Sequence, residues 1–164
     1  MNKRPNVVII TTHDSGKHFG CYGAGGVKTP NVDAVASDGV QFDRMFSVSS
    51  MCSPSRGSFL TGQWPERNGL LGLSGPKWRY QLADHSRHLS AVLKRNGYRT
   101  VLCGFQHEAI EDSDLAFDTI LPLEDGDRKK NAVEIAASAA GIIHASASDD
   151  QPTYLQIGFW ETHT

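Results

Sequence analysis

Runs of β-branched and apolar residues alternate with segments of helical character along this chain. The first run, residues 7–12, is continuously apolar or β-branched, which is typical of a strand buried on both faces. We therefore expect it to be a central strand of a parallel sheet. Further strands are predicted at residues 42–48, 99–103, 117–121 and 153–159.

Helices are predicted between these strands. They cover residues 30–39, 52–60, 86–96 and 131–147. Thr29 should cap the helix at residues 30–39, whose apolar face consists of Val32, Val35 and Ala36. In the helix at residues 86–96, Leu89, Val92 and Leu93 should face inward. Residues 63–84 are rich in Gly, Pro and Trp and predict a long surface loop, of the kind that often carries function.

The alternation of strands and helices predicts an α/β fold, a three-layer sandwich around a mostly parallel sheet. In such sheets the chemistry gathers beyond the carboxyl ends of the strands. Candidate site residues should therefore follow predicted strands.

The composition excludes some classes of function but does not indicate a particular one. The chain has 164 residues, 39% of them hydrophobic and 21% charged, which suits a soluble globular domain with one core. A net charge of -2 with only one short basic cluster argues against a nucleic-acid partner. The apolar stretches are strand-sized, so no membrane-spanning helix is expected.

The cysteines and the N-terminus bear on the compartment. Three cysteines are too few and too scattered for a disulfide framework. The apolar run after the first residues is too short for the core of a signal peptide. The chain as written is expected to be cytoplasmic, or periplasmic or secreted if an upstream export signal has been removed.

The chemistry concentrates at residues 52–62, which read C-S-P-S-R-G-S-F-L-T-G. Ser53 is expected to cap a helix, and Pro54 suits its first turn. Cys52 would then lie at the positive end of a helix dipole, where an anion is favoured. Arg56, one turn further on, is placed to clamp such an anion.

This run resembles the signature of the type I sulfatases. The resemblance implies that a maturation enzyme oxidises Cys52 to Cα-formylglycine, whose hydrated aldehyde is a geminal diol held against a divalent metal. One hydroxyl attacks the sulfur of a sulfate ester, and the second then expels sulfate as the hemiacetal collapses.

The residues after the first strand resemble the metal-binding opening of that family, in which two adjacent acidic residues bind the ion. Asp14 matches the second position, whereas His13 stands where the family usually has Asp. Ca²⁺ is typical of the family, but an imidazole ligand shifts the preference toward Mn²⁺ or Zn²⁺. Alternatively, His13 only orients the site by a hydrogen bond and Asp14 alone binds the metal.

Two histidines complete the resemblance. Residues 104–107 resemble a G-K-x-H motif, in which His107 matches the histidine that contacts the diol and Phe105 replaces a sulfate-binding lysine. His163 matches a histidine that contacts the sulfate or protonates the leaving oxygen. The implied catalytic residues are Cys52, Arg56, His107 and His163, and the implied metal ligands are His13, Asp14 and Cys52.

The resemblance extends over residues 4–164 but only over the N-terminal portion of a sulfatase catalytic domain. It implies that further metal ligands come from later sequence and that these residues alone are inactive. Residues 46–62, with Asn68, Gly69 and Leu70, look most like the heparan N-sulfatase (sulfamidase) branch, which acts on glycosaminoglycans. The expected activity is hydrolysis of a sulfuric ester or N-sulfo group on a sulfated carbohydrate; the oligomeric state stays open.

Two alternatives stand beside this hypothesis. Phe105 and His13 also suit a phosphate or phosphonate ester hydrolase of the alkaline-phosphatase-like superfamily. Phe105 and the short chain also suit a fragment that binds sulfated sugar without turnover. Neither Cys21 nor Cys103 has a predicted role beyond that of a small apolar residue.

Overall fold

The computed structural model describes residues 4–121 and 132–162 of the chain. The chain divides into two compact units, one formed by Met1–His13 with Val48–Thr164 and the other by Asp14–Ser47. The larger unit holds the sheet and most of the candidate site residues.

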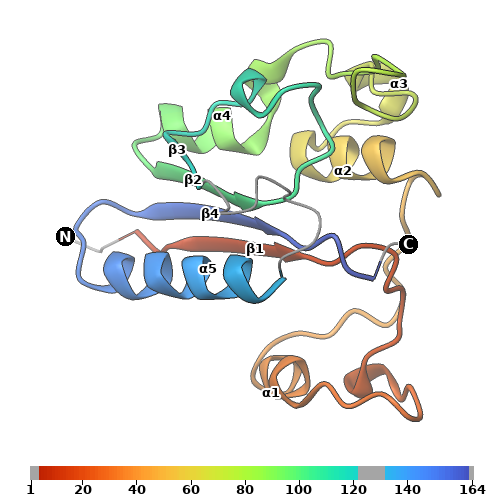
Figure 1. The fold of residues 1–164 in the computed structure, drawn as a ribbon, viewed down its shortest axis with the longest axis vertical. Helices are drawn as coiled ribbons and strands as arrows, with labels where there is room; N and C mark the ends of the chain where they lie inside the picture. Colours follow the sequence, from red (N-terminus) through yellow and green to blue (C-terminus); the bar gives the residue numbers. More distant parts are fainter. Residues whose placement is uncertain (1–3, 122–131, 163–164) are drawn as a thin grey trace. The chain divides into compact units, whose positions relative to one another are not determined.

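A parallel sheet of four strands forms the centre of the larger unit (Figure 1). In spatial order its strands are β1 (Val7–Thr11), β4 (Thr153–Gly158), β2 (Arg99–Gly104) and β3 (Thr119–Ile120). The strands predicted near these positions are confirmed. The parallel α/β architecture is confirmed as well.

Helices cover the two faces of this sheet (Figure 1). On one face, α5 (Ala132–Ala147) buries Ile135 and Ala139 against a core that includes Val101 and Leu155. On the other face, Leu89 and Leu93 of α4 (Leu89–Arg95) pack against the cluster around Leu102 and Tyr154. The helices predicted for these segments are confirmed, and the sheet between them gives three layers.

The first strand differs from its prediction. β1 lies at the edge of the four-stranded sheet, and Val8 and Ile10 are 42% and 62% exposed. Val7 and Ile9 pack against the cluster on the α4 side, but α5 contacts β4 and β2, so it leaves the opposite face of β1 open. The prediction of a central strand buried on both faces was therefore wrong for the described residues.

The predicted strand at residues 42–48 does not form. Phe42 and Phe46 are 61% and 83% exposed, and none of the described strands pairs with this segment. A strand needs a neighbour to satisfy its backbone groups, so the apolar pattern alone did not suffice.

The smaller unit contains a short 3₁₀ turn, η1 (Gly20–Tyr22), and the predicted helix α1 (Pro30–Asp38). Thr29 does not cap α1 with its side chain; its hydroxyl accepts from the Gly20 N–H and donates to Asp33 Oδ1. Asp33 also accepts from the Cys21 N–H at 2.7 Å, which ties η1 to α1. The expected apolar face of α1 is exposed at Val32 and Val35.

The long loop after α2 (Cys52–Thr61) is more ordered than predicted. It contains a single helical turn, α3 (Pro65–Asn68), and buries Leu70 and Leu82. Gly57 of α2 accommodates Leu70, because a Cβ there would stand 2.7 Å from Leu70 Cδ2.

The helix after this loop begins later than predicted. The turn η2 (His85–Arg87) precedes it, and the buried His88 caps α4 by accepting from the Ser90 N–H. A further turn, η3 (Asp112–Asp114), precedes β3.

We expect Gly158→Ala to destabilise the protein by about 2 kcal/mol or more, since overpacking forces backbone to move. A Cβ at Gly158 would lie 1.8 Å from the Phe105 carbonyl oxygen. Gly141 of α5 is the matched control, because a Cβ there meets nothing within 4 Å. Gly141→Ala should stabilise by up to about 1 kcal/mol. Urea unfolding of both variants measures the effect, and equal stabilities would contradict the close approach.

Candidate active site

Three parallel strands end at one edge of the sheet, and the segments that follow them are tied together. The Phe105 N–H donates to the Gly158 carbonyl at 2.8 Å, and the Phe159 N–H donates to the Thr11 carbonyl at 2.9 Å. His13 exchanges backbone hydrogen bonds with Glu161 and Thr162. The residues after β1, β2 and β4 therefore form one connected surface at the carboxyl edge, where α/β folds place their sites.

Helix α2 begins at Cys52, with Met51 as its N-cap residue. Ser53 is not the cap that the sequence predicted, because it already lies inside the helix and its hydroxyl accepts from the Ser74 N–H at 3.0 Å. Pro54 does fall in the first turn, where a missing N–H costs nothing. Cys52 is partly buried at the N-terminus of the helix, where the dipole favours negative charge.

His107 lies directly against Cys52, with its Nδ1 3.1 Å from Cys52 Sγ. Its other nitrogen, Nε2, lies 3.1 Å from the Ser74 carbonyl oxygen. Because a carbonyl only accepts, Nε2 carries the proton, and in the neutral ring Nδ1 presents its lone pair to the sulfur. Burial lowers the pKa of His107, against a smaller opposing effect of the bond to Ser74, so the ring is neutral at neutral pH.

His13 completes a cluster of potential metal donors with Cys52 and His107. The ligand atoms of the three side chains all lie within 4.8 Å of one another. His13 is 4% exposed, and its ring packs against both Phe105 and Trp160, with centroid distances of 5.6 and 5.2 Å. The imidazole is thus held in place beside Cys52 by two aromatic rings.

Arg56 is anchored by the protein around it. Its Nε donates to Glu108 Oε1 at 2.5 Å, in an ion pair whose side chains are 11% and 0% exposed. Its Nη1 donates to Thr11 Oγ1 at 3.3 Å and its Nη2 to the Phe105 carbonyl at 3.4 Å. These bonds use three of the five guanidinium N–H groups and fix the direction in which the others can meet an anion.

Glu108 is a site residue that the sequence analysis missed. Burial alone raises the pKa of its carboxyl, but the charges of Arg56 and His88 and the hydrogen bonds from Arg56 and the His107 N–H outweigh it, so the pKa is lowered. Its Oε2 accepts from the His107 N–H at 3.1 Å. Glu108 therefore links Arg56 to the backbone of His107. An acidic residue next to a candidate histidine was the available signal.

Phe105 occupies the middle of the cluster. It is 7% exposed, its ring centroid lies 5.2 Å from that of His107 and 4.7 Å from that of Trp160, and Arg56 Cζ lies 5.6 Å from it. Its ring brings no charge to the place where a lysine was expected. Arg56 is the side-chain cation that contacts this cluster within the described ranges.

In the described part of the larger unit, the structure contains four of the predicted site residues: Cys52, Arg56, His107 and His13. Asp14 is the first residue of the smaller unit; it is exposed, and its backbone has a left-handed φ of 55°. His163 lies outside the described residues. Trp160, which precedes it on the same segment, does reach the cluster.

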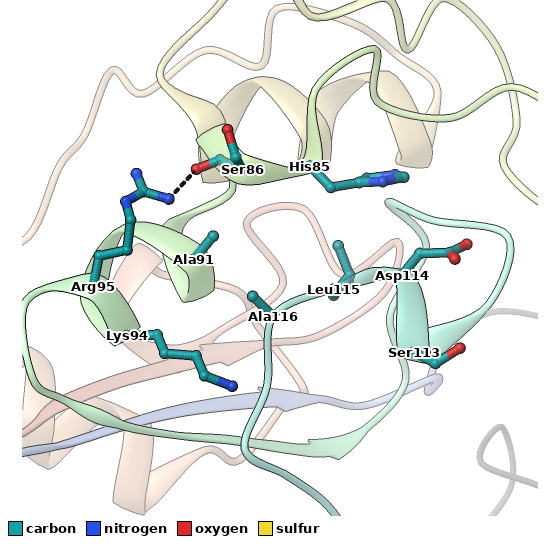
Figure 2. Close-up of a pocket in the computed structure, with 9 residues that line it drawn as sticks. All are labelled: His85, Ser86, Ala91, Lys94, Arg95, Ser113, Asp114, Leu115 and Ala116. Carbon is teal, nitrogen blue, oxygen red and sulfur yellow. Dashed lines mark hydrogen bonds between the residues drawn. The ribbon is translucent and has the colours of Figure 1, made fainter.

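A separate hollow lies between α4 and η3 (Figure 2). His85, Lys94 and Arg95 line one side of it, and Asp114 and Leu115 line the other. The Arg95 guanidinium donates to the Ser86 carbonyl at 2.7 Å. The residues that line this hollow include no cysteine and no predicted site residue, so the cluster around Cys52 is the candidate active site.

The chain belongs to the sulfatase family: residues 5–164 match the family model described as Sulfatase. Among curated proteins, it is 38% identical to human (Homo sapiens) arylsulfatase H over 119 residues, which is 65% of this chain and 20% of that protein. It is 30% identical to human N-sulphoglucosamine sulphohydrolase over 161 residues, 96% of this chain and 32% of that protein. The chain thus spans a fifth to a third of the length of these relatives.

Solved structures with a similar fold are also found. A structure of BT4656 in complex with its substrate D-glucosamine-2-N,6-O-disulfate superimposes with a TM-score of 0.76 at 26% identity, over 98% of this chain and 35% of that one. The Ps i-CgsB complex with k-i-k-neocarrahexaose gives 0.79 at 19% identity, over 98% and 46%, which is likeness of fold alone. Within the described residues, every helix is too short or too polar to cross a membrane.

We expect Arg56→Met and Glu108→Gln each to cost about 3 kcal/mol of stability, because each leaves a buried partner uncompensated. The double variant should cost clearly less than the sum. The exposed pair Arg87 and Asp84, 3.4 Å apart, is the matched control and should show little or no coupling. Urea unfolding at pH 7 measures both cycles. Additive losses at Arg56 and Glu108 would show that the two side chains do not act as a pair.

Proposed function

We propose that this protein is a sulfatase that hydrolyses a sulfate ester or N-sulfo group on a sulfated carbohydrate, with Cys52 as the precursor of the nucleophile. The position of Cys52 carries the proposal: it starts α2, one turn before Arg56, with His107 Nδ1 3.1 Å from its sulfur. We assign residues 1–164 to the N-terminal portion of a sulfatase catalytic domain. As in other sulfatases, a formylglycine-generating maturation enzyme would supply the modification.

Each residue of the cluster has a separate role in this proposal. Formylglycine at position 52, when present and hydrated, would supply two hydroxyl groups, one for attack and one for release of sulfate. His107 offers the Nδ1 lone pair as a proton acceptor at that position, since Nε2 is committed to Ser74. Arg56 would draw the sulfate toward the helix terminus with its remaining N–H groups, oriented by Glu108. We assign His163 the contact with the sulfate or the leaving oxygen.

The donors suit a divalent cation. His13 and residue 52 would hold it together with Asp14, and the nearness of His13 to Cys52 fits this assignment. A bound cation would polarise the sulfate oxygens and favour an ionised hydroxyl at residue 52. Ca²⁺ suits an all-oxygen set, whereas the imidazole of His13 favours Mn²⁺ or Zn²⁺.

The substrate class is inferred from the substrates named for two similar proteins. The human relative that 96% of this chain matches is named for N-sulphoglucosamine, and the structure of BT4656 contains a doubly sulfated glucosamine. We propose an amino sugar with an N-sulfo group, of the kind found in heparan-type glycosaminoglycans, as the substrate.

Peptide mass spectrometry over residue 52 tests the nucleophile. Full-length protein produced with a competent maturation enzyme should carry formylglycine, and Cys52→Ala should reduce sulfate release to background, because no covalent step remains. Cys21→Ser is the matched cysteine control and should keep full activity. A thiol that stays wholly unmodified under these conditions would refute the mechanism.

Phe105 supports a second candidate, hydrolysis of a phosphate or phosphonate ester. A buried phenyl ring gives the substrate anion no point charge where sulfatases use lysine. Comparing kcat/KM for an aryl sulfate and an aryl phosphate on the full-length enzyme separates the two. We expect sulfate to be preferred, and a large preference for phosphate would establish the second candidate instead. Phe105→Lys should raise sulfate turnover if the missing cation limits it.

A further inference from the structure

We propose that, while Cys52 keeps its thiol, His13, Cys52 and His107 form a binding site for Zn²⁺ or a similar transition metal ion. The inference concerns the unmodified protein and does not depend on the proposed function, which requires residue 52 to be converted. It rests on the position, chemistry and orientation of the three side chains.

The first support is position. The three ligand atoms lie within 4.8 Å of one another, and Cys52 Sγ is 3.1 Å from His107 Nδ1. In a tetrahedral zinc site, sulfur at about 2.3 Å and nitrogen at about 2.0 Å from the metal stand roughly 3.3–3.6 Å apart. Small side-chain rotations would bring the three atoms to that spacing. The three residues come from the segment after β1, the start of α2 and the segment after β2, so their closeness is set by the fold.

The second support is the donor type. One thiolate and two imidazoles are soft or intermediate ligands, which prefer Zn²⁺ and other transition metals to Ca²⁺ or Mg²⁺. Three protein ligands leave a fourth position open for water or an anion, as in many zinc enzymes. Binding would replace the S–H bond of Cys52 with a metal–sulfur bond and release its proton to solvent.

The third support is the orientation of His107. Its Nε2–H donates to the Ser74 carbonyl, so the Nδ1 lone pair faces the sulfur and can bind either a proton or a metal ion. Histidines that bind metals usually donate their other N–H to a carbonyl or carboxylate in this way. The rings of Phe105 and Trp160 hold His13 in place, which lowers the entropy that a ligand set must lose on binding.

At Cys52, metal binding would compete with the reactions of the free thiolate. A metal ion on the thiolate would hold the sulfur and shield it from reagents that attack free thiolate. After conversion of Cys52 the soft ligand is gone, and the site should turn toward cations that accept oxygen ligands. Thiol and converted forms of the protein should therefore differ in metal preference.

Cobalt substitution tests the site directly. The protein is produced without a maturation enzyme and titrated with Co²⁺, whose charge-transfer absorption from thiolate reports a cobalt–sulfur bond. We expect one equivalent to bind with this absorption and Zn²⁺ to displace it. Cys52→Ser should abolish the absorption, and His13→Asn and His107→Gln should weaken affinity by about 100-fold or more.

Cys21→Ser and His144→Gln are the matched controls, since Cys21 lies in the other unit and His144 is exposed on α5. Both should bind Co²⁺ as the unaltered protein does. Absorption that survives in Cys52→Ser, or that disappears in Cys21→Ser, would overturn the proposal. Circular dichroism of each variant confirms that it is folded.

Alkylation gives a second readout that needs no variant. We expect Zn²⁺ to slow the reaction of Cys52 with iodoacetamide at least tenfold and a chelator to restore the rate, followed by peptide mass spectrometry. Cys21 in the same sample is the internal control. Equal rates with and without Zn²⁺ would overturn the proposal, whereas sulfate release by the converted enzyme would be unaffected by that result.

Discussion

The buried ion pair between Arg56 and Glu108 is the interaction on which the candidate site depends. Arg56 belongs to α2, whereas its partners belong to the segment after β2 and to β1. A buried charge without a partner is very costly, so this pair restricts how α2 can sit against the sheet. Because Cys52 begins the same helix and Glu108 also accepts from the His107 N–H, one carboxylate sets the position of both reactive side chains.

Local patterns predicted the parts of the fold that local chemistry determines. The β-branched runs became β1, β2 and β4, and the signature became α2, which ends at the left-handed Gly62. Errors arose where burial or pairing decides. Among the described residues, none of the strands pairs with residues 42–48 despite their apolar pattern, and no helix covers Val8 and Ile10. The Ser53 hydroxyl accepts from the Ser74 N–H instead of capping the helix.

The candidate site was partly predictable for a topological reason. The family resemblance pointed to His13 and His107, and both follow predicted strands. Parallel strands end at one edge, so the closeness of these histidines to Cys52 follows from the topology. Glu108 and Trp160 could not be found in this way, since nothing local in a loop sequence tells which side chain turns inward. The functional roles of all six predicted residues, Asp14 and His163 included, stay predictions.

The charge balance of the cluster bears on the proposed binding of a cation. His107 is neutral, Phe105 carries no charge, and Glu108 offsets the positive charge of Arg56. Among the described residues, the cluster therefore has little net positive charge with which to attract a sulfate. A bound metal ion would be the largest local charge, and its identity would be chosen by the ligand at residue 52. Conversion of Cys52 would then do more than create a nucleophile: it would select the cation that makes the site attractive to an anion.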